Sequence, residues 1–282
     1  MTSLIAALIN LIEYKKRLVE KNITSLTLAI ALGDSFQNYI KDAFAGTFDT
    51  SKEKKLVIHN RVYSWQGNQN NPPDLILKGG DAIEVKKTES RSTLALNSSY
   101  PKNKISYNSF GVTKDCSKCE GENNKWVKDL IYICGVVKNK QVKSIFFLYG
   151  DIYAAHREIY VTLHDKIKDG INSIGGVELA RTRELGKVKR VDPLGITDFR
   201  MRGMWSIQHP LKVFNYLDQV TPKDDEPITA YALMSKEKYL GFDKHETQRL
   251  EKYSEANFYD KFVKDPNNPA NLIDAILIKI HF

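Results

Sequence analysis

Three side chains around a short hairpin have the types and spacing of a metal-dependent hydrolase. Asp74 precedes one apolar run, Glu84 and Lys86 lie on a second, and the tight Gly79-Gly80 turn joins the two runs. Because strand side chains alternate, Glu84 and Lys86 project from one face, and Asp74 lies across the turn from them. Two converging carboxylates bind Mg²⁺ through hard oxygen ligands, and a neighbouring ammonium orients or deprotonates an attacking water. The pattern predicts Mg²⁺-dependent phosphodiester hydrolysis.

The same residues have an ordinary structural interpretation. An Asp, a Glu and a Lys are common on the surface of a hairpin, and Asp-x9-Glu-x-Lys occurs often by chance. The apolar residues between them favour the catalytic interpretation, because a partly buried strand rarely carries unpaired charges without a reason. These apolar residues are Leu75, Leu77, Ile83 and Val85.

A second candidate region covers residues 181–202, whose net charge of +4 is half of the chain's +8. The two arginines at each end of this segment are separated by one residue, which predicts that each pair shares one strand face. Arginine pairs bidentately with guanine, whereas lysine more often contacts phosphates. A solvated basic surface, or salt bridges to Glu184, Asp192 and Asp198, is the alternative. The predicted DNA contacts are Arg181, Arg183, Lys187, Lys189, Arg190, Arg200 and Arg202.

Two groups of polar residues add further predicted DNA contacts. Asn97, Ser98 and Ser99 follow the predicted catalytic hairpin, and Gln208 lies in the segment after Trp205. All four side chains have hydrogen-bonding groups for phosphates or bases. The run Asn-Ser-Ser-Tyr-Pro is also typical of a plain turn.

Cys116 and Cys119 form a Cys-x-x-Cys pair that raises the question of zinc. A structural zinc site normally has a second pair of ligands, and Cys134 lies in an apolar run where burial is the simpler prediction. A zinc site completed by a distant His, or by a second copy of the chain, stays open.

Hydrophobic periodicity predicts the scaffold for these candidates. Helical spacing covers residues 4–20 and 26–44, with Gly33 interrupting the second segment. Strand-like runs cover 61–65, 74–78, 81–87, 130–137 and 144–149, and another helix covers 157–173. This order predicts an α/β or α+β protein with one central sheet.

Length and composition set the outer limits. The chain has 282 residues, 42% of them hydrophobic, and this composition predicts a soluble globular protein. We expect a single domain, with residues 1 to about 60 as an integral helical part. Disordered, collagen-like and disulfide-rich classes are excluded. The net charge of +8 favours a polyanionic partner. Three cysteines, with no signal peptide or membrane span evident, predict a cytoplasmic protein.

The motifs also resemble those of known nucleases. Pro73-Asp74 with Glu84-Val85-Lys86 is similar to the PD-(D/E)xK signature of restriction-endonuclease-like nucleases. More narrowly, the runs NPPD (71–74), GGDAIEVKK (79–87) and LALNSS (94–99) resemble the NgoPII family of type II restriction endonucleases. The likeness also includes the Gly33-Asp34 helix and the strand at 128–132, and it covers about residues 30–150.

The resemblance implies an α/β fold with a restriction-endonuclease-like core, a mixed central β-sheet flanked by helices. It implies a homodimer that uses Mg²⁺ to cut both strands of a short palindrome, GGCC for the family's namesake, in functional pairing with a cognate DNA methyltransferase. By position, Asp74 and Glu84 would ligate the metal and Lys86 would act on the water. Such folds often add an acidic or amide ligand from a preceding helix. Here Asp34 or Gln37 is the candidate, unless they form an N-cap and a solvated helix face.

Two other functions stay open at this stage. One is a structure-specific DNA repair or recombination nuclease of the same fold, and the other is a non-catalytic DNA-binding protein. The first would cut at ends, junctions or lesions, and the second would bind DNA without cutting it.

Overall fold

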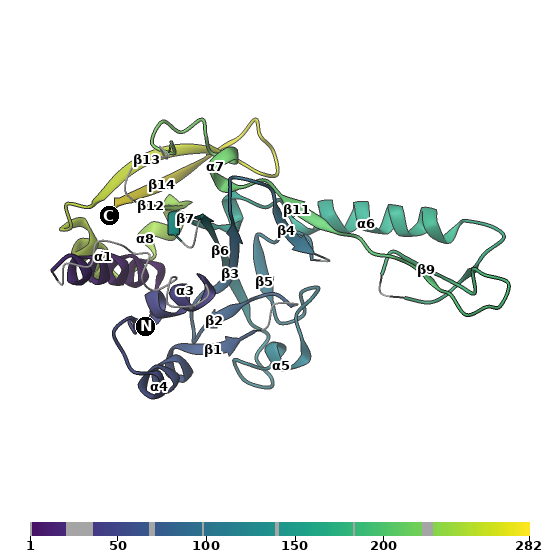
Figure 1. Cartoon of the computed structure of the whole chain (residues 1–282). Helices are drawn as coiled ribbons and strands as arrows, with labels where there is room; N and C mark the ends of the chain where they lie inside the picture. The colour runs from purple at the N-terminus through teal and green to yellow at the C-terminus, as the bar shows by residue number, and fades with distance from the viewer. Residues whose placement is uncertain are drawn as a thin grey trace.

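A mixed β-sheet runs through the centre of the molecule (Figure 1). The computed structural model describes residues 2–20, 36–67, 71–97, 99–138, 141–182, 184–221 and 228–282. Within them the sheet contains β1 (Tyr63–Gln66), β2 (Leu75–Leu77), β3 (Ala82–Thr88), β5 (Lys104–Ser106), β6 (Val127–Lys138), β7 (Gln141–Tyr149), β12 (Thr229–Ser235), β13 (Ala256–Lys264) and β14 (Leu272–His281). The order is β1-β2-β3-β6-β7-β12-β14-β13, with β5 paired to β6. β3 runs parallel to β6 and β7 runs parallel to β12, whereas the other neighbours in this order are antiparallel. The sheet is therefore mixed.

Helices cover one face of this sheet. Those of this region are α1 (Leu4–Glu20), α3 (Phe36–Ala45), α4 (Lys52–Val62), α8 (Lys236–Leu240) and α9 (Lys244–Glu251). Most of the apolar residues of α1 recur at helical spacing and are buried between the helices and the sheet. Helix α3 comes close to the sheet at Gly135, where a Cβ atom would lie 2.3 Å from the ring of Phe36. A side chain at Gly135 would therefore displace α3.

The other face of the sheet is covered by short elements and carries the candidate site. These elements are β4 (Leu94–Asn97) paired with β11 (Trp205–Ile207), α5 (Lys114–Ser117), α7 (Pro210–Val213) and the 3-10 turn η1 (Gly150–Ile152). Side chains alternate along β3. Ile83 and Val85 therefore pack on the face covered by the helices, and Ala82 packs on the other face. Glu84 and Lys86 share the face of Ala82.

Residues 157–182 and 184–202 form an arm that projects from the central sheet (Figure 1). The arm consists of α6 (Arg157–Asn172) and a small antiparallel sheet of β8 (Glu178–Leu179), β9 (Gly186–Lys189) and β10 (Phe199–Met201). Helix α6 has no buried residue, although Ile171 lies against Gly186 of β9. The basic segment identified in the sequence is therefore on an exposed extension.

The structure confirms the predicted fold class, a mixed α/β arrangement with a central sheet flanked by helices. The predicted helix at 4–20 matches α1, the helix at 157–173 matches α6, and the hairpin and the strands β6 and β7 form as expected. Of the helix predicted at 26–44, α3 is the part that lies within the described residues. None of the helices in the described ranges is long and apolar enough to cross a membrane.

Two local predictions were wrong. The strand predicted at 61–65 begins at Tyr63, because Arg61 and Val62 complete α4, a helix that the sequence analysis missed. Helix α4 buries none of its residues and has no apolar stripe, so it leaves no periodic signal. The residues Arg181 and Thr182 lie between strands β8 and β9, so the predicted strand face at Arg181 does not form.

Candidate active site

The β2–β3 hairpin places the two predicted carboxylates side by side. Gly80 donates its amide to the carbonyl of Leu77 over 2.9 Å, and Gly79 takes a φ of 67°, which a residue with a side chain adopts only with strain. Asp74 lies directly before β2, and its Oδ2 accepts a hydrogen bond of 2.7 Å from the amide of Val85 on β3. The tight turn and this bond together fix Asp74 against the strand that carries Glu84.

Glu84 and Lys86 form an ion pair on the same strand face, as strand alternation predicted. The distance from Lys86 Nζ to Glu84 Oε1 is 2.7 Å. Burial disfavours the charged form of Lys86, but Glu84 outweighs this effect, and the pKa of Lys86 lies above its ordinary value. The ion pair therefore favours the ammonium form of Lys86.

The two carboxyl groups are in electrostatic conflict. Asp74 and Glu84 are each only 9% exposed. Burial, with the nearby charge of Glu84 as a second cause, raises the pKa of Asp74 to about 7. A divalent cation between the groups would remove this conflict and keep both of them ionised.

An unpartnered oxygen tests whether these residues suit a metal ion. Glu84 Oε2 is buried and has no hydrogen-bond partner among the described residues, although its other oxygen is bound by Lys86. A buried carboxylate oxygen left without a partner costs free energy, so such an atom calls for an explanation. Together with Asp74 it offers the hard oxygen donors that Mg²⁺ prefers, and the residues fit that ion.

Other ligands from the preceding helix are not evident in the described residues. No group of three or more His, Cys, Asp or Glu side chains suited to a metal occurs in that part of the chain. Asp34 lies outside the described residues, so its tentative role as a metal ligand remains a prediction. Gln37 is on α3 and partly exposed. Lys41 lies on the same helix. Burial lowers its pKa, and the charge of Asp74 opposes this shift in part.

Lys102 is a neighbour of the site that the sequence analysis missed. It is 5% exposed and lines a small cavity together with Glu84, Ser99 and Tyr132. Burial lowers the pKa of Lys102 to about 8, against the opposing effect of Glu84. The sequence contains no pattern that marks Lys102, because it meets Glu84 only through the packing of its segment on β6.

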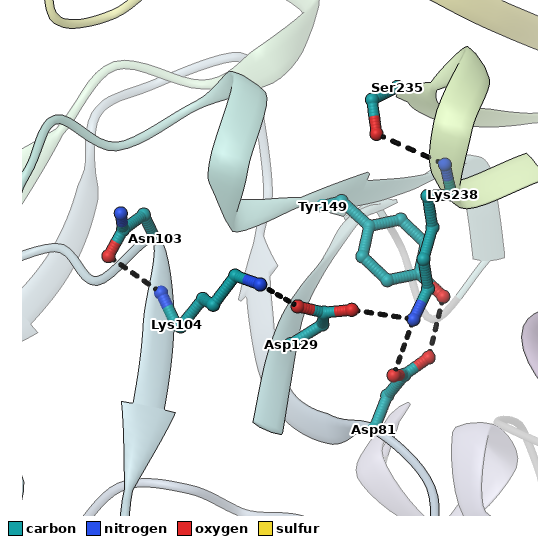
Figure 2. Close-up of polar contacts among 7 residues, drawn as sticks. All are labelled: Asp81, Asn103, Lys104, Asp129, Tyr149, Ser235 and Lys238. Atoms are coloured by element: carbon teal, nitrogen blue, oxygen red, sulfur yellow. Dashed lines mark hydrogen bonds and ion pairs between the residues drawn. The ribbon is translucent and has the colours of Figure 1, made fainter. Parts of the chain in front are cut away.

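A second polar cluster holds the start of β3 and β6 in place (Figure 2). Lys238 Nζ, from α8, lies 2.8 Å from Asp81 Oδ1 and 2.7 Å from Asp129 Oδ2. Tyr149 donates its hydroxyl to Asp81 Oδ2 over 2.6 Å, and Lys104 Nζ lies 3.0 Å from Asp129 Oδ1. The cluster ties four elements together next to the catalytic hairpin, and its carboxylates already have cationic partners.

The basic residues of the arm are mostly engaged in ion pairs. Arg200 Nη2 and Arg202 Nε lie 2.6 and 2.7 Å from Glu184 Oε1, and Lys187 Nζ lies 2.6 Å from Asp198 Oδ2. A further pair joins Arg190 to Glu178. Arg181 and Lys189 have exposed side chains, and Arg183 lies outside the described residues. Asp192 instead accepts hydrogen bonds from the backbone of its own turn.

The smaller predicted DNA contacts lie near the base of the arm. Ser99 is partly exposed and accepts a hydrogen bond from Lys102 Nζ, so it belongs to the surroundings of Glu84. Gln208 has an exposed side chain, and its carbonyl accepts a hydrogen bond from Tyr153. Ser98 and the side chain of Asn97 lie outside what the structure describes. Of the two described members, Ser99 lines the same small cavity as Glu84.

The cysteine pair forms a local contact. Thr113 caps the short helix α5 by accepting the amide of Cys116, and a hydrogen bond to Cys116 lowers the pKa of Cys119. Both thiols are free, as is Cys134, which is buried as predicted. Within the described ranges no third ligand stands beside the pair, so the structure offers no support for zinc here.

The mixed sheet flanked by helices, with a buried carboxylate pair next to a lysine, is consistent with a restriction-endonuclease-like fold. Comparisons with known proteins give the family. The model of the NgoPII restriction endonuclease family matches residues 2–264. The type II restriction enzyme NgoPII of Neisseria gonorrhoeae is 42% identical over an alignment of 282 positions that covers 99% of each chain. The chain therefore belongs to the NgoPII restriction endonuclease family and is a type II restriction enzyme. No solved structure gives a significant match.

Proposed function

We propose that this protein is a Mg²⁺-dependent endonuclease that hydrolyses phosphodiester bonds of double-stranded DNA at a short palindromic site, GGCC being the expected sequence. The observation that carries the proposal is the buried pair Asp74 and Glu84 with one unpartnered carboxylate oxygen, in a chain 42% identical to a type II restriction enzyme. The arrangement has the character of a PD-(D/E)xK site, with Asp74 in the first position and Glu84-Val85-Lys86 in the second.

Each residue of the trio has a distinct task in this proposal. Asp74 and Glu84 hold the metal, which when bound supplies positive charge to the phosphate. Lys86 donates a hydrogen bond to the attacking water, and its charge offsets the negative charge that grows on the phosphate in the transition state. The ion pair with Glu84 holds the Lys86 Nζ beside the proposed metal ligands.

The arm is the proposed DNA-contacting surface. Its basic residues lie on an exposed extension next to the catalytic face, and exposed ion pairs of the kind found there are weak enough for phosphates to replace them. Asn97, Ser98, Ser99 and Gln208 complete the proposed contacts.

Cutting both strands of a palindrome calls for two active sites, so we propose a homodimer of single-domain subunits. A cytoplasmic location and a cognate methyltransferase, which would protect host DNA, belong to the same proposal.

Digestion of a sequenced plasmid tests the function without any variant. The proposal predicts discrete fragments in Mg²⁺ and uncut DNA when a chelator removes the metal. Mapping the fragment ends gives the recognition sequence and the cut position together. A smear, or cutting confined to ends, junctions or lesions, would instead favour a structure-specific nuclease. DNA that is bound but stays uncut would favour a binding protein.

A further inference from the structure

Lys102 is a buried cation that has no counter-ion within the described residues. Its Nζ donates to the hydroxyl of Ser99 and, over 3.2 Å, to the carbonyl of Tyr100, and it lies 4.8 Å from the centre of the Tyr100 ring. Among the described residues Lys102 forms no ion pair, and Glu84, which lines the same cavity, is the carboxylate whose charge acts on it. An ammonium has three donors, and two of them are used here. One donor therefore remains unused, and the positive charge has no carboxylate in direct contact.

The position of Lys102 relative to Glu84 is fixed by the backbone. The amide of Lys102 donates to the hydroxyl of Tyr132 over 2.8 Å, and that hydroxyl donates to the carbonyl of Lys102 over 3.2 Å. Tyr132 is the neighbour of Glu84 across the parallel pair β3 and β6. The chain before β5 also lies close to Gly150, where a Cβ atom would come within 2.6 Å of the Lys102 carbonyl. A side chain at Gly150 would push this segment out of place.

Lys102 and Glu84 line the same small space. The cavity measures about 10 Å³, which is room for about one water molecule, and Ser99 and Tyr132 also line it. A single oxygen atom of a ligand fits there, whereas a whole phosphate group does not. The cavity therefore joins an unmatched cation to the carboxylate with the unpartnered oxygen.

We propose that Lys102 and Ser99 form an anion subsite that holds a nonbridging oxygen of the scissile phosphate beside Asp74 and Glu84. The inference rests on the proposed function, because it assumes a phosphodiester at this site. A phosphate oxygen supplies the negative charge that Lys102 lacks. Ser99 accepts from Lys102, so its own hydroxyl hydrogen is left to donate to the same oxygen. Negative charge on the nonbridging oxygens grows during hydrolysis, and a cation placed there stabilises the transition state.

The test is Lys102→Met, which removes the charge and keeps a side chain of similar length. We expect the single-turnover cleavage rate in Mg²⁺ to fall roughly 100-fold to 1,000-fold, the usual loss when one charge-stabilising donor is removed. We also expect the slope of log Kd against log salt concentration, measured for DNA binding in a chelator, to fall by about one unit, since one phosphate contact is lost. Lys252→Met, at an exposed lysine directly after the end of α9, is the matched control.

The results separate the subsite from the function as a whole. A Lys102→Met protein that cleaves at the wild-type rate with an unchanged salt slope overturns the subsite, while cleavage by the wild type leaves the proposed function standing. If the wild type does not cleave, the proposed function fails and the salt slope alone decides the subsite. If Lys102→Met does not fold, Ser99→Ala replaces it. Its expected rate loss is about tenfold for one uncharged hydrogen bond, and a wild-type rate overturns the subsite.

Discussion

The β2–β3 hairpin and the arm differ in how their charges are paired. At the hairpin, Asp74 and Glu84 are buried, and one carboxylate oxygen has no partner among the described residues. On the arm, Arg200 and Arg202 are more than half exposed, yet both are paired with Glu184. A buried carboxylate oxygen at the hairpin thus lacks a partner, whereas these two exposed arginines each have one.

This difference indicates where a bound ligand would gain the most free energy. An unmatched buried charge costs free energy in the empty protein, and a ligand that supplies the missing charge recovers that cost. An exposed ion pair is weak, because water and salt screen it, so its partners exchange readily for phosphates. The hairpin is thus suited to catalysis and the arm to adjustable, salt-sensitive contact with DNA.

The largest effect outside the metal ligands is expected from Lys86→Met. Loss of the ammonium that orients the water should lower the single-turnover cleavage rate roughly 100-fold to 10,000-fold, the range of a positioned acid or base. Lys87→Met is the matched control, since Lys87 neighbours Lys86 in the chain but lies exposed on the opposite strand face. Equal rates for the two variants would remove Lys86 from the reaction. Partial activity of Lys86→Arg, whose side chain stays charged, would favour charge stabilisation over proton abstraction.

A smaller effect is expected from His209, a buried group outside the active site. His209 is fully buried, its Nδ1 caps α7 by accepting the amide of Leu211 over 3.2 Å, and burial lowers its pKa from 6.5 to about 4. The unfolded chain binds a proton that the folded protein resists, so stability should fall as the pH drops from about 6.5 to 4. The loss from this one group is up to about 3 kcal/mol.

Urea unfolding of the wild type and His209→Asn at pH 7 and pH 4.5 measures this effect. Asn keeps a capping oxygen but does not titrate, so the variant should lose less stability than the wild type between the two pH values. If both proteins lost the same free energy of unfolding between pH 7 and pH 4.5, burial would not control the charge of His209. That result would weaken the argument that buried charge is costly in this protein.

The smallest effects are expected on the arm. Arg200→Gln should leave the thermal unfolding midpoint nearly unchanged, because the lost pair with Glu184 is exposed. DNA affinity should fall, with the slope of log Kd against log salt reduced by about one unit. Arg249→Gln provides the control, since Arg249 forms a similarly exposed pair with Glu13 on α1, away from the arm. A slope that changes equally in both variants, or in neither, would argue against the arm as the DNA surface.

The sequence predicted those parts of the structure that have a strong periodic signal. Helix α1 and strands β6 and β7 bury long apolar stripes or runs, and the turn at Gly79-Gly80 set the register that joins Asp74 to Glu84. The trio was predictable because all of its members lie within 13 residues, where local geometry decides which side chains meet.

The rest depends on contacts between distant segments. Helix α4 buries nothing, so no pattern marks it. Lys102 meets the site only because Tyr132 and Gly150 fix its segment. The pairing of Arg200 and Arg202 with Glu184 depends on how the strands β9 and β10 return along the arm, and the spacing of the arginines alone does not specify it.

The central claim is that Glu84, with Asp74, holds the metal ion on which cleavage depends. Its most direct test is the single-turnover rate at which Glu84→Gln cuts duplex DNA in Mg²⁺, beside Glu89→Gln, an exposed glutamate just beyond β3. We predict a loss of at least about 1,000-fold for Glu84→Gln, since a metal ion supplies several kcal/mol of transition-state stabilisation, and a wild-type rate for Glu89→Gln. Undiminished Mg²⁺-dependent cutting by Glu84→Gln would contradict the claim.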